Sequence, residues 1–195
     1  LVGSEMCIRD RNGKGESMDL IIKNGTVVTE SGSFLADVGI AGGKIACVGM
    51  NLDDKGAKVV DARGMLVLPG AIDVHTHLAM PFGGTVSADD YESGTRAAAC
   101  GGVTTVFDYA IQRKGKGIIE TVKARREMAE PSACVDIAFH CAVTDLNDGA
   151  VLDEFSDAVA YGISSLKCFM VYKKEGMMVD DGTFAKILLK GKETG

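Results

Sequence analysis

Short apolar segments separated by turn residues run through the first third of the chain. We predict strands for six of these segments, at residues 19–23, 26–29, 37–41, 44–48, 58–61 and 65–68. Gly42-Gly43 separates two of them and is a typical two-residue hairpin turn, and Asn24-Gly25 predicts a turn between the first two. Residues 18–68 are therefore expected to form a small all-β unit, which is too short to bury a large core by itself.

From Pro69 onward the pattern changes to strand, loop and helix in repetition. The predicted strands cover residues 71–77, 103–109, 135–143 and 164–171. The predicted helices run from a capping-box signal at Ser87 and Asp90 to about Cys100, then over 118–130, over 150–161 and from 184 onward. This alternation is typical of parallel β-α-β units, so residues 69–195 are expected to form about four β/α units, half of a (β/α)8 barrel. A doubly wound open sheet is the alternative, but no G-x-G-x-x-G follows the first strand.

Charge and cysteine content narrow the class of protein. The 195 residues carry a formal net charge of −6, which argues against nucleic acid or an anionic membrane as a partner. No apolar run approaches the roughly 20 residues that span a bilayer. The six cysteines form no C-x-x-C pair, which is typical of a reduced, cytoplasmic protein.

The two ends of the chain differ from the rest. Residues 1–17 have no sustained hydrophobic periodicity, and residues 2–11 resemble a translated sequencing-adapter read-through. We expect this segment to be a non-native tail and Met18 to be the natural start. The last predicted helix reaches the end of the chain without a stop signal, so the sequence is expected to be a fragment.

The segment 70–77 carries the strongest chemical signal, because Asp73, His75 and His77 occupy alternate positions of a predicted strand. Side chains alternate between the two faces of a strand, so these three share one face while Ile72 and Val74 share the other. Two imidazoles roughly 6–7 Å apart along a strand can bind one metal ion. An H-x-H pair alone is a weak signal, and its alternative interpretation is two polar residues at a strand end. Active sites of barrels gather at this end of the strands, which favours a metal site.

Lys167 lies in the middle of the apolar strand 164–171. Strands of parallel sheets are covered on both faces, so the ammonium either reaches the barrel mouth and pairs with a carboxylate, or loses its proton. A neutral amine can react with CO2 to give a carbamate, an anionic group with two oxygens that can bridge two metal ions. Tyr172 follows the strand, and its hydroxyl either donates to a developing oxyanion or serves in packing. The apolar loop 78–85 is expected to be a flexible lid or a packing segment.

These residues carry a resemblance to a known family. PGAIDVHTHLAMPFGGT, DDYESGTRAA, GGVTTVFDY and SSLKCFMVYKK, together with the opening MDLIIKNGTVVT, resemble the dihydropyrimidinase/D-hydantoinase family of cyclic amidohydrolases over nearly all of 18–195. The resemblance implies a (β/α)8 barrel flanked by a β-sandwich, of which residues 18–68 are a part. It also implies a site with two Zn²⁺ ions, where Mn²⁺ or Co²⁺ are alternatives.

The resemblance also implies roles for individual residues. By position, His75 and His77 match ligands of the more buried metal, Lys167 matches the carboxylated bridging lysine, and Tyr172 matches the tyrosine that binds the substrate carbonyl. Two further histidines and a catalytic aspartate are expected from later strands that the sequence does not contain. His140 matches no ligand position and is expected to be structural. The chain by itself is therefore expected to be inactive.

The implied reaction is hydrolysis of a cyclic ureide or imide to an N-carbamoyl amino acid, as in pyrimidine degradation. Related dihydroorotases and many allantoinases carry an arginine shortly after H-x-H, which in dihydroorotases holds the substrate carboxylate. Here Leu78-Ala79-Met80 follows instead, which favours neutral rings, either dihydropyrimidines or 5-substituted hydantoins. The resemblance suggests a homotetramer when the protein is full length.

Two other functions remain as alternatives. Collapsin response mediator proteins are non-catalytic scaffolds of the same fold, but they resemble this family with the histidine ligands replaced. A mononuclear nucleobase deaminase of the same superfamily keeps H-x-H but lacks the lysine on strand four. Retention of His75, His77 and Lys167 together favours the cyclic amidohydrolase.

Overall fold

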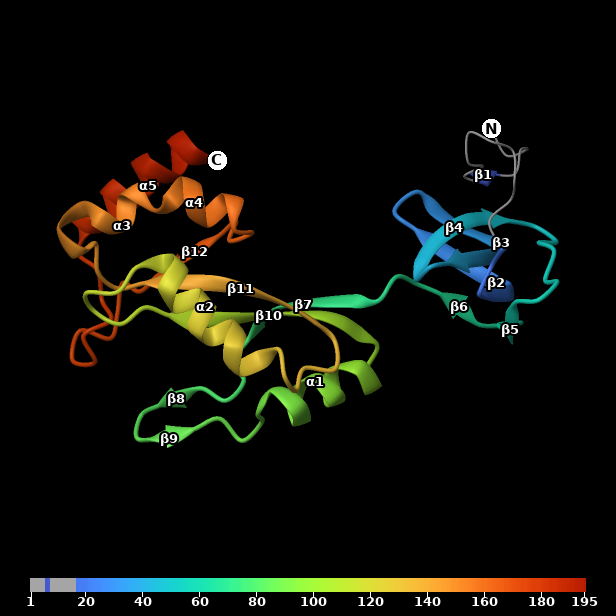
Figure 1. The fold of residues 1–195 in the computed structure, drawn as a ribbon, viewed down its shortest axis with the longest axis horizontal. Coiled ribbons are helices and arrows are strands. Elements are labelled where there is room, and N and C mark those ends of the chain that lie inside the picture. Colours follow the sequence, from blue (N-terminus) through green and yellow to red (C-terminus); the bar gives the residue numbers. More distant parts are fainter. Residues whose placement is uncertain (1–5, 8–16) are drawn as a thin grey trace. The chain divides into compact units, whose positions relative to one another are not determined.

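The computed structural model describes residues 6–7 and 17–195, and the chain divides into two compact units (Figure 1). The first unit is Leu1–Pro69 and the second is Gly70–Gly195. The expected tail at 1–17 lies outside the described residues, except for residue 17 and the short strand β1 at Met6–Cys7.

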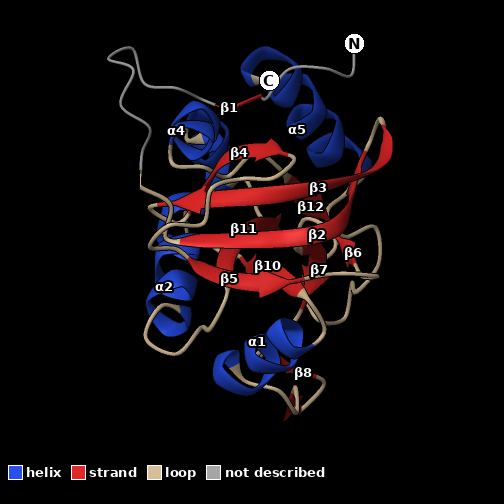
Figure 2. Ribbon diagram, turned by 90° about the vertical axis from the view of Figure 1, so that its right-hand side faces the viewer, coloured by secondary structure: helices blue, strands red, loops and turns tan. Residues whose placement is uncertain are grey.

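The N-terminal unit is a six-stranded sheet in the order β1-β4-β3-β2-β5, with β6 paired to β2 (Figure 2). Its strands after β1 are β2 (Leu20–Thr29), β3 (Gly32–Ala41), β4 (Lys44–Gly49), β5 (Lys58–Asp61) and β6 (Leu66–Val67). The predicted hairpin at Gly42-Gly43 is confirmed: β3 and β4 pair antiparallel, and both glycines have positive φ, +56° and +75°. Such a turn needs left-handed backbone at both positions, which glycine adopts without strain.

The predicted turn at Asn24-Gly25 is wrong. A single strand, β2, runs through both residues, and its register with β3 shifts between Ile22 and Gly25, which is a bulge. Asn24 takes a φ of +63°, and its backbone N–H donates to Asp37 Oδ1 at 2.9 Å. A Cβ on Gly25 would lie 2.4 Å from Val67 Cγ2, so the close approach of β6 requires glycine here. Tertiary contacts therefore produce a β-bulge at Asn24-Gly25, where the sequence predicts a turn.

The second unit is built on a parallel four-stranded sheet in the order β12-β11-β10-β7. Its strands are β7 (Ala71–Thr76), β10 (Val103–Ile111), β11 (Asp136–Val143) and β12 (Leu166–Cys168). Each strand lies beside the next one along the chain, with no reversal of order. A doubly wound sheet requires a point where the strand order reverses, so this order is that of a barrel. The predicted α/β barrel class is confirmed.

Helices cover one face of this sheet. They are α1 (Tyr91–Cys100), α2 (Ile118–Ala129), α3 (Ala150–Asp153), α4 (Phe155–Ala160) and α5 (Asp181–Thr194). In Figure 1, α2 lies along β10 and β11. Phe139, Cys141 and Val143 alternate along β11 and are buried in a core that includes Val122 of α2. The side chains between them, including His140, lie on the opposite face.

Two helix predictions need correction. The single helix expected at 150–161 is two short helices, α3 and α4, separated at Glu154, with a 3-10 turn at Asn147–Gly149 before them. Glu154 Oε2 accepts the N–H of Ile119 in the first turn of α2 at 3.1 Å, so a tertiary contact occupies the residue at the break. The capping box of α1 is formed by Asp90 and Ser93, not by Ser87. None of the helices in the described parts of the chain is long and apolar enough to cross a membrane.

The loop 78–85 contains more structure than a flexible lid. A small hairpin of β8 (Pro81–Phe82) and β9 (Thr85–Val86) closes on Gly83-Gly84, both with positive φ. Ser87 Oγ anchors its base by donating to the carbonyl of His77 at 2.7 Å. Ile72 and Val74 are 59% and 58% exposed on the edge strand β7.

Candidate metal centre

His75 and His77 converge at the carboxyl end of β7. Their Nε2 atoms lie 3.1 Å apart and their ring centroids 5.0 Å apart. Two imidazole nitrogens bound to one tetrahedral zinc ion are roughly 3.3 Å apart, given Zn–N bonds of about 2.05 Å. The strand alternation therefore brings both rings to one face at a separation that suits a shared ion.

The environment of His77 favours the form that binds a metal. Burial lowers the pKa of His77, and the neighbouring Lys167 and His75 lower it further. A neutral imidazole is the ligand form, so this shift keeps a lone pair available at neutral pH. Nδ1 of His77 is buried without a hydrogen-bond partner among the described residues. Buried polar atoms of this kind call for an explanation, and a metal site that fixes the ring is one.

Asp73 differs from its expected setting. Its side chain does share the strand end with His75, whose backbone N–H donates to Asp73 Oδ1 at 3.1 Å. The residue is exposed, so its charge carries no burial penalty and needs no cation. Asp73 therefore gives no independent support for the metal site.

Tyr109 of β10 organises the group, although the sequence reasoning gave it no role. Its ring centroid lies 4.7 Å from that of His75 and 5.0 Å from that of His77. Lys167 Nζ lies 4.2 Å from the same centroid. One aromatic ring therefore contacts all three proposed ligands, two from β7 and one from β12. The sequence feature that could have identified Tyr109 is its position near the carboxyl end of the second barrel strand, on the face opposite the core.

Lys167 has no ion-pair partner in the part of the chain that the structure describes. Its ammonium contacts the ring of Phe169 at 5.0 Å in addition to Tyr109. Burial lowers the pKa of Lys167. Of the two interpretations that the sequence left open, the structure contains the half-buried lysine without a carboxylate, which is the state that favours the neutral amine.

Tyr172 lies outside this immediate group. It has a φ of +66°, and its ring packs edge-on against Phe169 and Phe82, each at 5.5 Å between centroids. Phe169 thus contacts both Tyr172 and Lys167, while Phe82 links Tyr172 to the hairpin β8-β9. Its side chain is 40% exposed, so the hydroxyl is accessible to a ligand.

His140 is held by the protein on both sides of its ring. Nε2 lies 3.0 Å from the carbonyl oxygen of Val74, which can only accept, so this nitrogen donates. Nδ1 then accepts from the hydroxyl of Ser165. With both ring nitrogens used, His140 has no lone pair for a metal, in line with its expected structural role.

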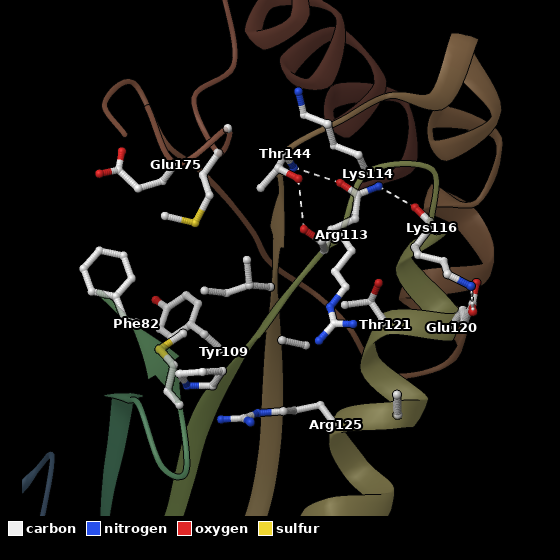
Figure 3. Close-up of a pocket in the computed structure, with 18 of the residues that line it drawn as sticks. Phe82, Tyr109, Arg113, Lys114, Lys116, Glu120, Thr121, Arg125, Thr144 and Glu175 are labelled. Atoms are coloured by element: carbon white, nitrogen blue, oxygen red, sulfur yellow. Dashed lines mark hydrogen bonds and ion pairs between the residues drawn. The ribbon is translucent and has the colours of Figure 1, made fainter. Parts of the chain in front are cut away.

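An open cavity of about 860 Å³ adjoins the group and is lined by Phe82, Tyr109, Met177 and residues of α2 (Figure 3). Figure 3 shows Tyr109 and Phe82 on one side and Arg125 below. Its lining combines apolar and aromatic side chains with polar and charged ones, among them Arg113, Lys114 and Glu175.

The protein side chains present form an incomplete ligand set. Within residues 6–7 and 17–195, no cluster of three or more His, Cys, Asp or Glu side chains can hold a metal ion. Two imidazoles and one unpaired amine do converge on Tyr109, and a carbamate on the amine would add two oxygen ligands. These donors fit zinc, which takes nitrogen and oxygen ligands, but they leave coordination positions open.

Comparisons with known proteins agree with this arrangement. A D-hydantoinase of Geobacillus stearothermophilus is 46% identical over 179 residues, which cover 91% of this chain and 38% of that protein. A dihydropyrimidinase of Rattus norvegicus is 39% identical over 171 residues, covering 85% of this chain and 33% of that protein. The structure of a dihydropyrimidinase from Brevibacillus agri superposes with a TM-score of 0.87 at 46% identity, covering 91% and 38% of the two chains.

The resemblance inferred from the motifs is thus confirmed, and the chain spans little more than a third of the length of these relatives. The family is generally metal-dependent. The model of the amidohydrolase family matches residues 66–180, which include the histidine pair, the clustered tyrosine and the unpaired lysine. The chain therefore belongs to the amidohydrolase family.

Proposed function

We propose that the protein hydrolyses the cyclic amide bond of dihydropyrimidines or 5-substituted hydantoins and releases N-carbamoyl amino acids. One observation carries the proposal: the convergent Nε2 atoms of His75 and His77 share the ring of Tyr109 with the unpaired Lys167. The names of the relatives, D-hydantoinase and dihydropyrimidinase, support the same reaction class. The remaining ligands and the catalytic aspartate would come from outside this sequence.

In this proposal, His75 and His77 would hold one metal ion, and Lys167, as a carbamate, would supply oxygen ligands to two ions. The neutral amine nitrogen attacks the carbon of CO2, one C=O electron pair moves to oxygen, and the nitrogen releases a proton to water. The lowered pKa of Lys167 supports this step, because it increases the fraction of neutral amine. Two Zn²⁺ ions bound there would supply a water molecule with a near-neutral pKa and polarise the amide carbonyl. Mn²⁺ and Co²⁺ suit the same donors.

Tyr172 is proposed to donate its hydroxyl hydrogen to the substrate carbonyl oxygen as negative charge develops there. Its contacts with Phe169 and Phe82 support an ordered ring, and its exposure keeps the hydroxyl accessible. Phe82 comes from the hairpin β8-β9, which places an apolar side chain at the cavity and excludes water from that side.

A neutral substrate ring is supported by the segment that follows the histidine pair. Leu78, Ala79 and Met80 carry no charge, so this segment offers no partner for a substrate carboxylate. Arg125, which lines the cavity, is paired with the buried carboxylate of Asp108 at 2.9 Å. A cation already neutralised in this way does not bind a substrate carboxylate strongly. The uncharged segment supports dihydropyrimidines and hydantoins over carboxylated rings.

The proposal includes a homotetramer in the cytoplasm that takes small cyclic ureides or imides as substrates, with no nucleic acid or membrane partner. The net charge of −6 supports the exclusion of polyanionic partners. Cys100, Cys134, Cys141 and Cys168 are all thiols, which supports a reducing compartment.

The test is metal content and hydrolysis in a protein that carries this chain at the full length of its relatives. About two zinc ions per chain and turnover of dihydrouracil or hydantoin are the expected results. The double variant His75→Asn/His77→Asn should lose zinc and turnover, while Lys174→Ala, at an exposed position, should keep both. One zinc ion per chain would favour a mononuclear deaminase, and a folded protein without zinc would favour a scaffold.

A further inference from the structure

A buried ion pair lies directly behind the histidine pair, on the core side of the sheet. Asp108 of β10 is fully buried, and Arg125 of α2 is 10% exposed. Asp108 Oδ2 accepts from Arg125 Nη2 at 2.9 Å and Nε at 3.1 Å, and from the hydroxyl of Tyr91 at 2.6 Å. Three donors on one carboxylate oxygen hold its position and offset the cost of burying the charge.

The second carboxylate oxygen of Asp108 and the terminal nitrogens of Arg125 bind the main chain that follows His77. Asp108 Oδ1 accepts the N–H of Leu78 at 3.3 Å. Arg125 Nη2 donates to the carbonyl of Leu78, and Nη1 donates to the carbonyl of Ala79 at 3.4 Å. Both polar backbone groups of Leu78 are therefore bound by the two members of one ion pair. A planar guanidinium provides these several directions at once, which an ammonium cannot.

The backbone held in this way is strained. Ala79 has a φ of +46°, in the left-handed region that an alanine rarely adopts. Such a conformation persists only where surrounding contacts determine it. The ion pair fixes the residue just before it, and the N–H of Ala79 donates to the carbonyl of Asp89 at 2.8 Å.

From these contacts we infer that Arg125 and Asp108 are positioning residues that fix the backbone after His77 and thereby hold the imidazole of His77 at metal-binding separation from that of His75. Nδ1 of His77 has no hydrogen-bond partner among the described residues, so the ring is placed by its backbone, by packing against Tyr109 and by its contact with His75. The hydrogen bonds of Asp108 and Arg125 with Leu78 form a clamp on this backbone. Their loss would free the backbone after His77. The inference rests on the proposed metal site and adds to it a residue on helix α2, about 50 positions along the chain from the ligand it serves.

The test uses Arg125→Lys, which keeps the charge beside Asp108 but removes the fork that reaches Leu78 and Ala79. Arg126→Lys, on the next residue of the same helix and with its guanidinium at the surface, is the matched control. Both are made in the zinc-loaded protein at the full length of its relatives. Zinc release to a chelator, the visible spectrum of the Co²⁺-substituted protein and hydrogen exchange of the Leu78 amide in the zinc-free protein are measured.

We expect Arg125→Lys to weaken zinc binding about 10- to 100-fold, the range known for partners of metal ligands, and to shift the Co²⁺ spectrum. Exchange of the Leu78 amide should rise, and Arg126→Lys should match the unmodified protein in all three measurements. A residue that is only structural would lower the melting temperature without altering the spectrum of the folded protein.

Two outcomes separate the inference from the proposal on which it rests. If the unmodified protein binds zinc and Arg125→Lys binds it equally well with an unchanged spectrum, the positioning role is overturned while the proposed function stands. If the unmodified, folded protein binds no zinc, the proposed function fails. In that case the exchange of Leu78 still reports whether the clamp exists.

Discussion

Lys167 Nζ lies 4.2 Å from the centre of the Tyr109 ring, on the sheet face opposite the helices. The π face of a tyrosine favours a cation, whereas removal of water disfavours it. Burial lowers the pKa of Lys167. Lys167 therefore contacts an aromatic face in a setting that favours its neutral amine.

Replacing Lys167 by alanine tests the proposed carbamate. In the full-length protein, Lys167→Ala should lower metal content and reduce turnover by more than the 10- to 100-fold expected for a residue that only contacts a metal ligand, because a bridging ligand is removed. Short carboxylic acids such as acetate should restore part of the activity by supplying two oxygens in the same space. Metal analysis and turnover with and without acetate are the measurements, with Lys174→Ala as the control. Full activity without added acid would rule out the bridge.

Tyr172→Phe separates oxyanion stabilisation from metal binding. Removal of the hydroxyl should reduce turnover by about 10²- to 10³-fold, the usual effect of losing one donor to a developing oxyanion. Metal content should stay unchanged, since Tyr172 is not one of the proposed ligands and its ring packs against Phe169 and Phe82. Turnover and zinc content of the same preparation are compared. An unchanged rate would remove Tyr172 from the reaction.

Tyr91 should make the fold sensitive to alkali. Burial, and then its hydrogen bond to Asp108, raise the pKa of the hydroxyl far above its ordinary value of 10.0. The contribution to stability is present below pH 10 and is lost as the pH rises further, because the unfolded tyrosine then ionises and the folded one does not. At pH 10.5 the loss is roughly 1 kcal/mol.

Tyr91→Phe removes this component and provides the comparison. Urea unfolding at pH 8.5 and pH 10.5 gives the change in free energy of unfolding for both proteins. The unmodified protein should lose more stability than the variant between these two values. Equal losses would show that the Tyr91 hydroxyl ionises in the folded state much as it does in the unfolded state.

Gly70→Ala should destabilise the start of the barrel unit. A Cβ at this position would lie 2.1 Å from Thr104 Oγ1 and 2.7 Å from Thr104 Cβ, and a short β-branched side chain cannot move away. The expected loss is about 1–3 kcal/mol, as for overpacked sites. Gly191→Ala in α5 is the control, because no atom lies within 4 Å of its new Cβ and alanine favours the helix. Chemical denaturation of both variants is the measurement, and equal stability would contradict the proposed clash.

Local signals in the sequence were sufficient where neighbouring residues decide the structure. Strand Lys58–Asp61 and the hairpin turn at Gly42-Gly43 match their predictions, since turn chemistry and alternation are local. The break in the predicted helix 150–161 could not be predicted in the same way. It depends on Glu154 binding the N–H of Ile119, 35 positions earlier in the chain.

In the candidate site, too, some features follow from neighbouring residues and others depend on distant segments. His75 and His77 are two residues apart, so strand alternation alone places both rings on one face. Tyr109 and Arg125 belong to other elements, and their relation to the histidines depends on the register of β10 against β7 and on how α2 packs. No periodicity of the sequence contains that information, because it arises when distant segments pair.

The proposed ligands occupy the two edge strands of the four-stranded sheet, β7 and β12, with β10 and β11 between them. The residues of the proposed site are therefore synthesised at different times. His77 leaves the ribosome about 90 residues before Lys167, which at 5–20 residues per second is on the order of 5–20 s. The histidine pair and Tyr109 are therefore synthesised before Lys167, and the amine joins the group only after both central strands have been made.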